Sequence, residues 1–163
     1  GKASSQSIRK VAELGWKPLH LLSAGSTGRS ILSAAGLENC TGIVAIRYAK
    51  EVGVPRFEKD PDVMAFEALR KKYLPTVDPD NTIAFAGYGQ VASMAEILRR
   101  CGDDLTRANV LKQATTLAGF HSPYFLDGVN FSYTPDDYTP MKTLYISEFN
   151  GKDWDISDKP VTE

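Results

Sequence analysis

The residues best placed to do chemistry lie in one short segment rich in small and hydroxyl side chains. The stretch HLLSAGSTGRS passes from an apolar run through Ser23, Ala24, Gly25 and Ser26 into a helix-like sequence. In α/β proteins such a strand-to-helix loop carries a phosphate-binding loop, a nucleophilic serine or a polar cradle for a small ligand. These three kinds of site need different partner residues, so the sequence can distinguish between them.

The first two kinds of site lack their partners. A phosphate loop needs GxxxxGK[ST], and the segment after Gly25 has neither that spacing nor the lysine. A nucleophile elbow needs GxSxG, whereas Ser26 lies in GSTG, and the candidate bases are limited to His20, inside the predicted strand, and His121. Two interpretations stay open: a cradle that offers hydroxyl and amide donors to a carboxylate, or a tight turn without a ligand.

A second motif, GYGQVA at residues 87–92, matches the dinucleotide-binding pattern GxGxxA and follows an apolar run. No second strand with an acidic residue follows about 20 residues later, as a Rossmann unit requires. Apolar residues instead continue at three- and four-residue spacing through both glycines. The pattern favours one long helix within residues 81–102, and a nucleotide-binding enzyme domain remains the alternative.

Composition narrows the class of protein further. The 163 residues carry a net charge of -1 with scattered basic residues, which gives no footprint for nucleic acid or anionic membrane. Cys40 and Cys101 are too few for a metal site and are either buried small groups or a disulfide pair. No cofactor or metal is predicted. The chain opens at Gly1 without Met or a signal-peptide pattern, so we expect the native N-terminus to be absent.

The elements that position the loop alternate between helix and strand. Residues 4–16 and 29–36 have helical periodicity, and residues 17–22 and 41–49 read as strands. This order is the signature of a parallel α/β sheet flanked by helices. Further expected elements are helices in 60–75, 81–102 and 105–119, a strand at 129–133, and a C-terminal β-hairpin in 141–157 with its turn at Asn150-Gly151.

Four stretches together resemble one family of receptors. They are IRKVAELGWKP, AAGLENCTGIV, RRCGDDLTRANVLKQA and YTPMKTLYISEFNGKDW. The combination resembles the C-terminal half of a type I periplasmic substrate-binding protein, in the branched-chain amino acid-binding family of ABC transporters. The resemblance covers almost the whole chain. Receptors of this family are about twice as long and have two lobes joined by crossing strands.

The resemblance implies a fold and a function. It places residues 1–48 in the C-terminal lobe, 53–125 in the N-terminal lobe and 126–163 in a return to the C-terminal lobe, with hinges near 48–53 and 126–129. The implied protein is a non-enzymatic periplasmic receptor whose hinges close on a ligand. Its implied partners are a small carboxylate, aromatic acid or amino acid-like ligand, an ABC permease and the missing N-terminal half of the same receptor, with no nucleic acid. Because Cys40 and Cys101 would lie in different lobes, no disulfide between them is expected.

The resemblance also suggests which residues touch the ligand. The loop after the second-lobe strand faces the cleft, so the expected ligand-binding residues are Gly1, Lys2, Ser23, Ala24, Gly25 and Ser26. In amino acid-binding members a glutamate of this loop pairs with the ligand's ammonium, but Ala24 or Ser23 stands in its place here. The implied ligand therefore lacks a free α-amino group. A ligand-sensing regulatory domain on the same fold remains a further alternative.

Overall fold

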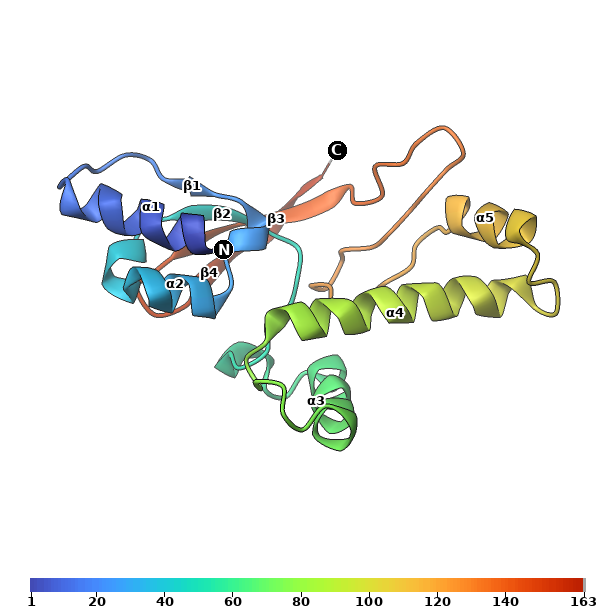
Figure 1. Ribbon diagram of the computed structural model, residues 1–163. Coiled ribbons are helices and arrows are strands. Elements are labelled where there is room, and N and C mark those ends of the chain that lie inside the picture. Colours follow the sequence, from blue (N-terminus) through green and yellow to red (C-terminus); the bar gives the residue numbers. More distant parts are fainter. Residues whose placement is uncertain (163) are drawn as a thin grey trace. The chain divides into compact units, whose positions relative to one another are not determined.

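The computed structural model describes residues 1–162, which form two compact units (Figure 1). The first unit contains Gly1–Tyr48 and Leu144–Thr162, and the second contains Ala49–Thr143. The chain therefore passes between the units twice, once after Tyr48 and once after Thr143.

The first unit is a four-stranded sheet with helices. Its elements are α1 (Lys2–Glu13), β1 (Leu21–Leu22), α2 (Arg29–Ala35), β2 (Val44–Arg47), β3 (Thr143–Phe149) and β4 (Trp154–Thr162), with short 3-10 helices η1 (Ala24–Ser26) and η2 (Leu37–Cys40). The strand order is β1-β2-β3-β4. Strand β1 pairs with β2 in parallel and β3 pairs with β2 in antiparallel orientation. The predicted α/β class with its parallel pair and C-terminal hairpin is confirmed, and the hairpin makes the sheet mixed.

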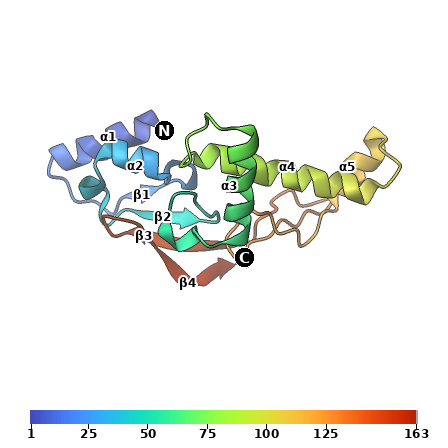
Figure 2. The same cartoon turned by 90° about the horizontal axis from the view of Figure 1, so that it is seen from below.

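Helices α1 and α2 lie together on one face of this sheet (Figure 2). Amphipathic helices need such a surface, because their stability comes mainly from burying the apolar face. The core beneath them is one cluster of buried side chains from both helices and three strand regions: Ile8, Leu32, Ala35, Cys40, Ile43, Ala45, Phe149 and Trp154. The core thus holds the carboxyl ends of β1 and β2 in a fixed position.

The first predicted strand is much shorter than residues 17–22. Only Leu21 and Leu22 pair with β2, and Leu19 and Leu21 are exposed rather than buried. Strand β1 lies at the edge of the sheet, where Pro18 has no main-chain N–H to offer to a ladder. His20, expected inside this strand, precedes it and accepts a bond from the Val44 N–H through its carbonyl.

The second unit consists of helices and loops. Its elements are α3 (Pro61–Tyr73), α4 (Thr82–Cys101), α5 (Arg107–Thr115) and the short η3 (Pro55–Phe57). The side chains of Asp60, Asn81 and Thr106 cap α3, α4 and α5 by accepting bonds from main-chain N–H groups. The strand predicted at 129–133 is wrong: the described residues there form a single bridge between Phe120 and Phe131. All of residues 50–142 lie outside the named strands.

Helix α4 runs uninterrupted through the GYGQVA motif. Its glycines therefore do not form the strand-to-helix turn that a dinucleotide site requires. Gly89 is buried against the segment that contains Ser122 and Tyr124. A Cβ atom at this position would lie 2.5 Å from Tyr124 Cβ and 2.8 Å from Ser122 Oγ. A Cβ atom on Gly87 would meet no other atom within 4 Å. Packing of the helix, rather than phosphate binding, explains Gly89.

The unit boundaries differ in one place from those expected for lobes. Residues 126–143 group with the second unit, whereas the resemblance implied that residues 126–163 return to the C-terminal lobe. The return is made by β3 and β4 alone, because only these strands pair into the sheet of the first unit. Assignment of the units to the lobes of a larger receptor stays a prediction.

The two glycines of α4 give a matched test of packing. Gly89→Ala should lower the free energy of unfolding by about 1–3 kcal/mol, because the added methyl overlaps Tyr124 and Ser122. Gly87→Ala should be neutral or stabilising by about 0.5–1 kcal/mol, because alanine is the better helix former and meets nothing. Urea unfolding of both variants measures the difference, and equal effects would contradict the packing described here.

Candidate functional site

The candidate site lies at the edge of the sheet where β1 and β2 end. These two strands run parallel, so their carboxyl ends meet at one edge, the place where α/β sheets bind ligands. Ser23 directly follows β1, and Ala24–Ser26 form η1. The small residues singled out in the sequence thus lie at this edge, and Arg47 ends the neighbouring strand.

Ser4 of α1, which the sequence did not single out, links Gly1 to the loop. The Ser4 hydroxyl donates to Ser26 Oγ at 2.9 Å, and the Gly1 nitrogen lies 3.5 Å from Ser4 Oγ. Ser23 Oγ also donates to Ser26 Oγ, at 3.4 Å. Lys2 is exposed at the start of α1, and the structure gives its side chain no contact with the loop. The serines at the start of α1 were visible in the sequence, but their partner was not.

A buried arginine supports the loop from within the unit. Arg47 Nη1 donates to Thr27 Oγ1 at 2.7 Å, and the guanidinium lies 5.4 Å from the centre of the Trp154 ring. Trp154 Nε1 donates to the Thr27 carbonyl at 3.1 Å, and Thr27 Oγ1 donates to the Ala24 carbonyl at 2.8 Å. Arg47 and Thr27 are each 5% exposed. Arg47 and Trp154, from distant parts of the chain, therefore fix the conformation of η1 through Thr27.

The loop has few donors left for a ligand. The main-chain N–H groups of Ser26 and Thr27 already bond to Ser23 and Ala24. The first N–H groups of a helical turn have no acceptor within it, which leaves those of Ala24 and Gly25. Ser23 and Gly25 are exposed, whereas Ser26 is buried and its hydroxyl accepts two bonds. The exposed Gly25 amide is thus the best-placed donor, and the Ser23 hydroxyl can offer its one proton to a ligand only by giving up its long bond to Ser26. Ser26 holds the loop together.

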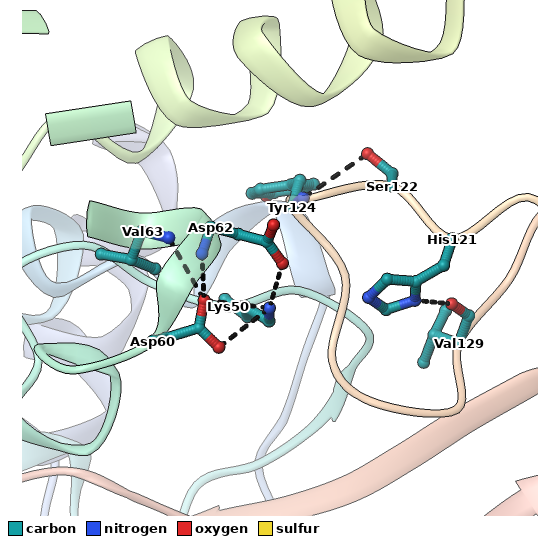
Figure 3. A network of polar contacts seen from close by, with 8 residues as sticks. All are labelled: Lys50, Asp60, Asp62, Val63, His121, Ser122, Tyr124 and Val129. Atoms are coloured by element: carbon teal, nitrogen blue, oxygen red, sulfur yellow. Dashed lines mark hydrogen bonds and ion pairs between the residues drawn. The ribbon is translucent and has the colours of Figure 1, made fainter. Parts of the chain in front are cut away.

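The second unit contains a charged cluster around Lys50 (Figure 3). The Lys50 ammonium lies 2.9 Å from Asp60 and 2.7 Å from Asp62, and its side chain is 4% exposed. Asp60 also accepts from the N–H groups of Asp62 and Val63 as the N-cap of α3. The Lys50 N–H donates to the Tyr124 carbonyl at 2.9 Å. The cluster ties the start of α3 to the segment that enters the unit, so it is structural.

Opposing effects set the pKa values in this cluster. Burial alone would lower the pKa of Lys50, but the hydrogen bonds to Asp62 and Asp60 outweigh it and raise this pKa. Burial alone would raise the pKa of Asp60, but the bonds from Lys50, Val63 and Asp62 outweigh it and lower this pKa. Both groups stay charged near neutral pH, which is unlike the poised pKa of a general acid or base.

Other reactive side chains have structural partners. His121 Nδ1 lies 2.8 Å from the Val129 carbonyl (Figure 3). The neighbouring Ser122 hydroxyl donates to the Gly89 carbonyl at 3.2 Å. Cys40 and Cys101 are buried and free. Burial, with a smaller effect of the Glu38 charge, raises the pKa of the Cys40 thiol to about 11, so this thiol stays protonated.

Residues 1–162 contain no cluster of three or more His, Cys, Asp or Glu side chains that could hold a metal ion. None of the helices in that range is long and apolar enough to span a bilayer. The Ser23–Ser26 loop, which the sequence singled out, lies where the parallel strands β1 and β2 end. Whether Gly1, Lys2, Ser23, Ala24, Gly25 and Ser26 contact a ligand stays a prediction.

The chain is similar in sequence to one protein family and in fold to several solved structures. A family model described as periplasmic binding protein matches residues 1–153. A search of curated proteins found no match. Among solved structures, a branched-chain amino acid ABC transporter protein from Thermus thermophilus with bound valine has a TM-score of 0.77 and 19% identity, over 98% of this chain and 43% of that one.

Two other solved structures are similar in the same way. A substrate-binding periplasmic protein from Ralstonia solanacearum has a TM-score of 0.74 and 18% identity, over 98% of this chain and 42% of that one. An ABC transporter substrate-binding protein from Aeropyrum pernix has a TM-score of 0.71 and 17% identity, over 99% and 42%. At these identities the likeness shows the fold. The chain spans about two fifths of the length of each of these proteins.

Mutation of Arg47 tests whether this residue stabilises the loop through Thr27. Arg47→Met should lower the free energy of unfolding by about 1.5–3 kcal/mol, because it removes a charged donor from the buried Thr27 hydroxyl. Arg47→Lys should recover part of this loss, since it restores a charge but not the planar stack on Trp154. Urea unfolding followed by tryptophan fluorescence measures both, with the exposed Lys17→Met as control. An effect of Arg47→Met no larger than that of the control would show that Arg47 does not stabilise the loop through Thr27.

The Lys50 cluster predicts a pH effect. Asp60→Ala should cost about 1–3 kcal/mol at pH 7, because it removes a helix cap and a partner of a buried ammonium. Asp62→Ala should cost less, about 0.5–1 kcal/mol, because Asp62 is more exposed. The contribution of Asp60 is present above its unfolded pKa and is lost as the pH falls through its lowered folded pKa. The unfolding free energies of wild type and Asp60→Ala should therefore converge in acid, and a constant gap down to pH 2 would count against this assignment.

Proposed function

Because the chain belongs to the periplasmic binding protein family, we propose that it forms part of a receptor that binds a small solute between two lobes. The receptor delivers this solute to an ABC permease, acts in the periplasm and catalyses no reaction. The observation that carries the proposal is the Ser23–Ser26 loop, held at the carboxyl edge of a parallel strand pair by the buried Arg47 and Trp154. A rigid loop with exposed donors suits binding, because little entropy is lost when the ligand is held.

The two units correspond, in this proposal, to parts of the two lobes. The first unit belongs to the C-terminal lobe and the second to the N-terminal lobe, and the chain connects them at Tyr48–Ala49 and Thr143–Leu144. Rotation about such connections closes a receptor on its solute. The solute stabilises the closed state because it binds that state more tightly than the open one. The remainder of the N-terminal lobe is supplied by the part of the receptor outside the 163 residues.

The loop also suggests the class of solute. No carboxylate occurs between His20 and Gly36, so an ammonium group docked at Ser23 would lack a counter-charge from this loop. Burying an unpaired charge is costly, whereas hydroxyl and amide donors suit a carboxylate. The proposed solute is therefore an acid without a free α-amino group, such as an aromatic or short aliphatic acid, or a neutral amide. Valine, which is bound in the similar Thermus thermophilus structure, is of the other class.

Two alternatives from the sequence carry less weight. A nucleotide-binding enzyme domain would need the GYGQVA glycines in a loop, but they lie inside α4. A ligand-sensing regulatory domain on the same fold would bind its ligand at the same loop and would differ in what surrounds this chain. The transport receptor is preferred because the similar solved structures are named as ABC transporter proteins.

Matched pairs of acids test the solute class. The receptor from its complete reading frame should gain thermal stability with 4-methylpentanoate, 3-methylbutanoate or 3-phenylpropanoate, and none with leucine, valine or phenylalanine. These pairs differ only in the α-amino group. Thermal shift measures the effect, and 100-fold excess over Kd would contribute about 2.7 kcal/mol.

Two controls accompany this screen. Ser23→Ala should reduce the shift, whereas Ser33→Ala, at an exposed position of α2, should leave it unchanged. The 163-residue chain alone should respond weakly, since it encloses a solute from one side only. Stabilisation by an amino acid but not by its des-amino partner would disprove the proposed solute class.

A further inference from the structure

A chain of hydrogen bonds runs from Arg47 to the main chain of the Ser23–Ser26 loop. Arg47 Nη1 lies 2.7 Å from Thr27 Oγ1, and Thr27 Oγ1 lies 2.8 Å from the Ala24 carbonyl oxygen. A guanidinium has only donors, and a carbonyl oxygen has only lone pairs that accept. The Thr27 hydroxyl therefore accepts from Arg47 and gives its single proton to Ala24, so the direction of both bonds is fixed.

The Ala24 carbonyl belongs to the same peptide group as the Gly25 N–H. A hydrogen bond that draws electron density toward the carbonyl oxygen leaves the amide hydrogen more positive, because the peptide group is conjugated and hydrogen bonds in series polarise one another. The Ala24 oxygen also accepts a second, longer bond from the Thr27 N–H at 3.4 Å. Both bonds therefore strengthen the Gly25 N–H as a donor.

The two ends of this chain of bonds differ in exposure. Arg47 and Thr27 are each 5% exposed, so water weakens their interaction little. Gly25 is exposed, and a Cβ atom placed on it would meet no other atom within 4 Å. The surface at Gly25 is thus open to a ligand, while the charge that polarises its peptide lies inside the unit.

Holding the loop in shape does not by itself require a charge at position 47. The Thr27 hydroxyl could hold the Ala24 carbonyl alone, and Trp154 Nε1 holds the Thr27 carbonyl at 3.1 Å. Burying a guanidinium is costly, and apolar side chains of similar volume fill such positions at a lower cost. The charge gains a use if the loop binds an anion, because a hydrogen bond to an ionised partner is about twice as strong as a neutral one.

We infer that Arg47, acting through Thr27, makes the Gly25 N–H selective for an ionised carboxylate over a neutral carbonyl group. The inference rests on the proposed function, because it takes the Ser23–Ser26 loop to contact the solute. It narrows the proposed solute from an acid or a neutral amide to the acid. Arg47 is a positioning residue here, since it touches Thr27, and Thr27 touches the peptide group that meets the solute.

Matched acids and amides test this selectivity. Isothermal titration calorimetry on the protein from the complete reading frame compares 3-phenylpropanoate and 4-methylpentanoate, each with its own primary amide. Wild type should bind the acid on the order of 10-fold more tightly than the amide, roughly the difference between a charge-assisted and a neutral hydrogen bond. Thr27→Val should remove most of this preference, because it keeps the shape of the side chain and removes the hydroxyl.

Three further variants separate the bonds in the chain. Thr27→Ser keeps the hydroxyl and should keep the preference for the acid. Arg47→Met keeps Thr27 but removes the charge behind it, so it should lose the preference. Thr41→Val, at an exposed threonine of the same unit, controls for the loss of a hydroxyl and should leave both affinities unchanged. Circular dichroism checks that each variant is folded at the temperature of the titration.

The ratio of the two affinities decides the outcome. Equal weakening of acid and amide in Thr27→Val and Arg47→Met would show that these residues only hold the loop in shape, and it would overturn the inference. An amide that binds wild type as tightly as its acid would also overturn the inference, while leaving the receptor function intact. Failure of both acids and both amides to bind would reject the proposed solute class, and the selectivity with it.

Discussion

The rest of the structure depends on a constraint of layered proteins: every apolar face must be buried, and each unit of this chain buries only one. In the first unit, α1 and α2 cover one face of the sheet. In the second unit, Phe66 and Tyr124 pack against one side of α4 at Phe85. The opposite faces remain apolar and exposed at Ile46 and Val91. The chain covers 43% of the similar Thermus thermophilus structure.

Within that constraint, strand β2 organises the candidate site. It pairs with β1 on one side and with β3 on the other, so it links the N-terminal and C-terminal segments of the chain. Its last residue, Arg47, reaches Thr27 and Trp154 and thereby fixes the loop after β1. The burial of a guanidinium is costly unless its donors are used, so this position is tightly specified. The site is rigid because the sheet and the loop share these contacts.

Local patterns predicted the fold well where local physics decides it. The three- and four-residue spacing of apolar residues correctly predicted α4 as one helix despite Gly87 and Gly89. Asn150-Gly151 correctly predicted the turn between β3 and β4. The prediction failed where tertiary pairing decides. The apolar run at 17–22 forms two residues of edge strand, and the aromatic run at 129–133 makes only one bridge. Neither failure changes the fold class.

The candidate site was predictable only in part, for a related reason. Small residues after a strand identify a loop by composition, so Ser23–Ser26 could be found in the sequence. The side chains of Ser4, Arg47 and Lys50 form hydrogen bonds to partners 10 to 22 residues away, and no local spacing encodes such contacts. An arginine at the end of an apolar strand was the available signal for Arg47, because a charge there must find a partner when it is buried.

The most direct test of the central claim is a crystal structure of the protein from the complete reading frame, grown with 3-phenylpropanoate. The carboxylate of this acid is expected to lie between the lobes, within hydrogen-bond distance of Ser23 Oγ and the Gly25 N–H, with Arg47 still bonded to Thr27. A solute bound elsewhere, with the Ser23–Ser26 loop facing solvent, would disprove the proposed binding site.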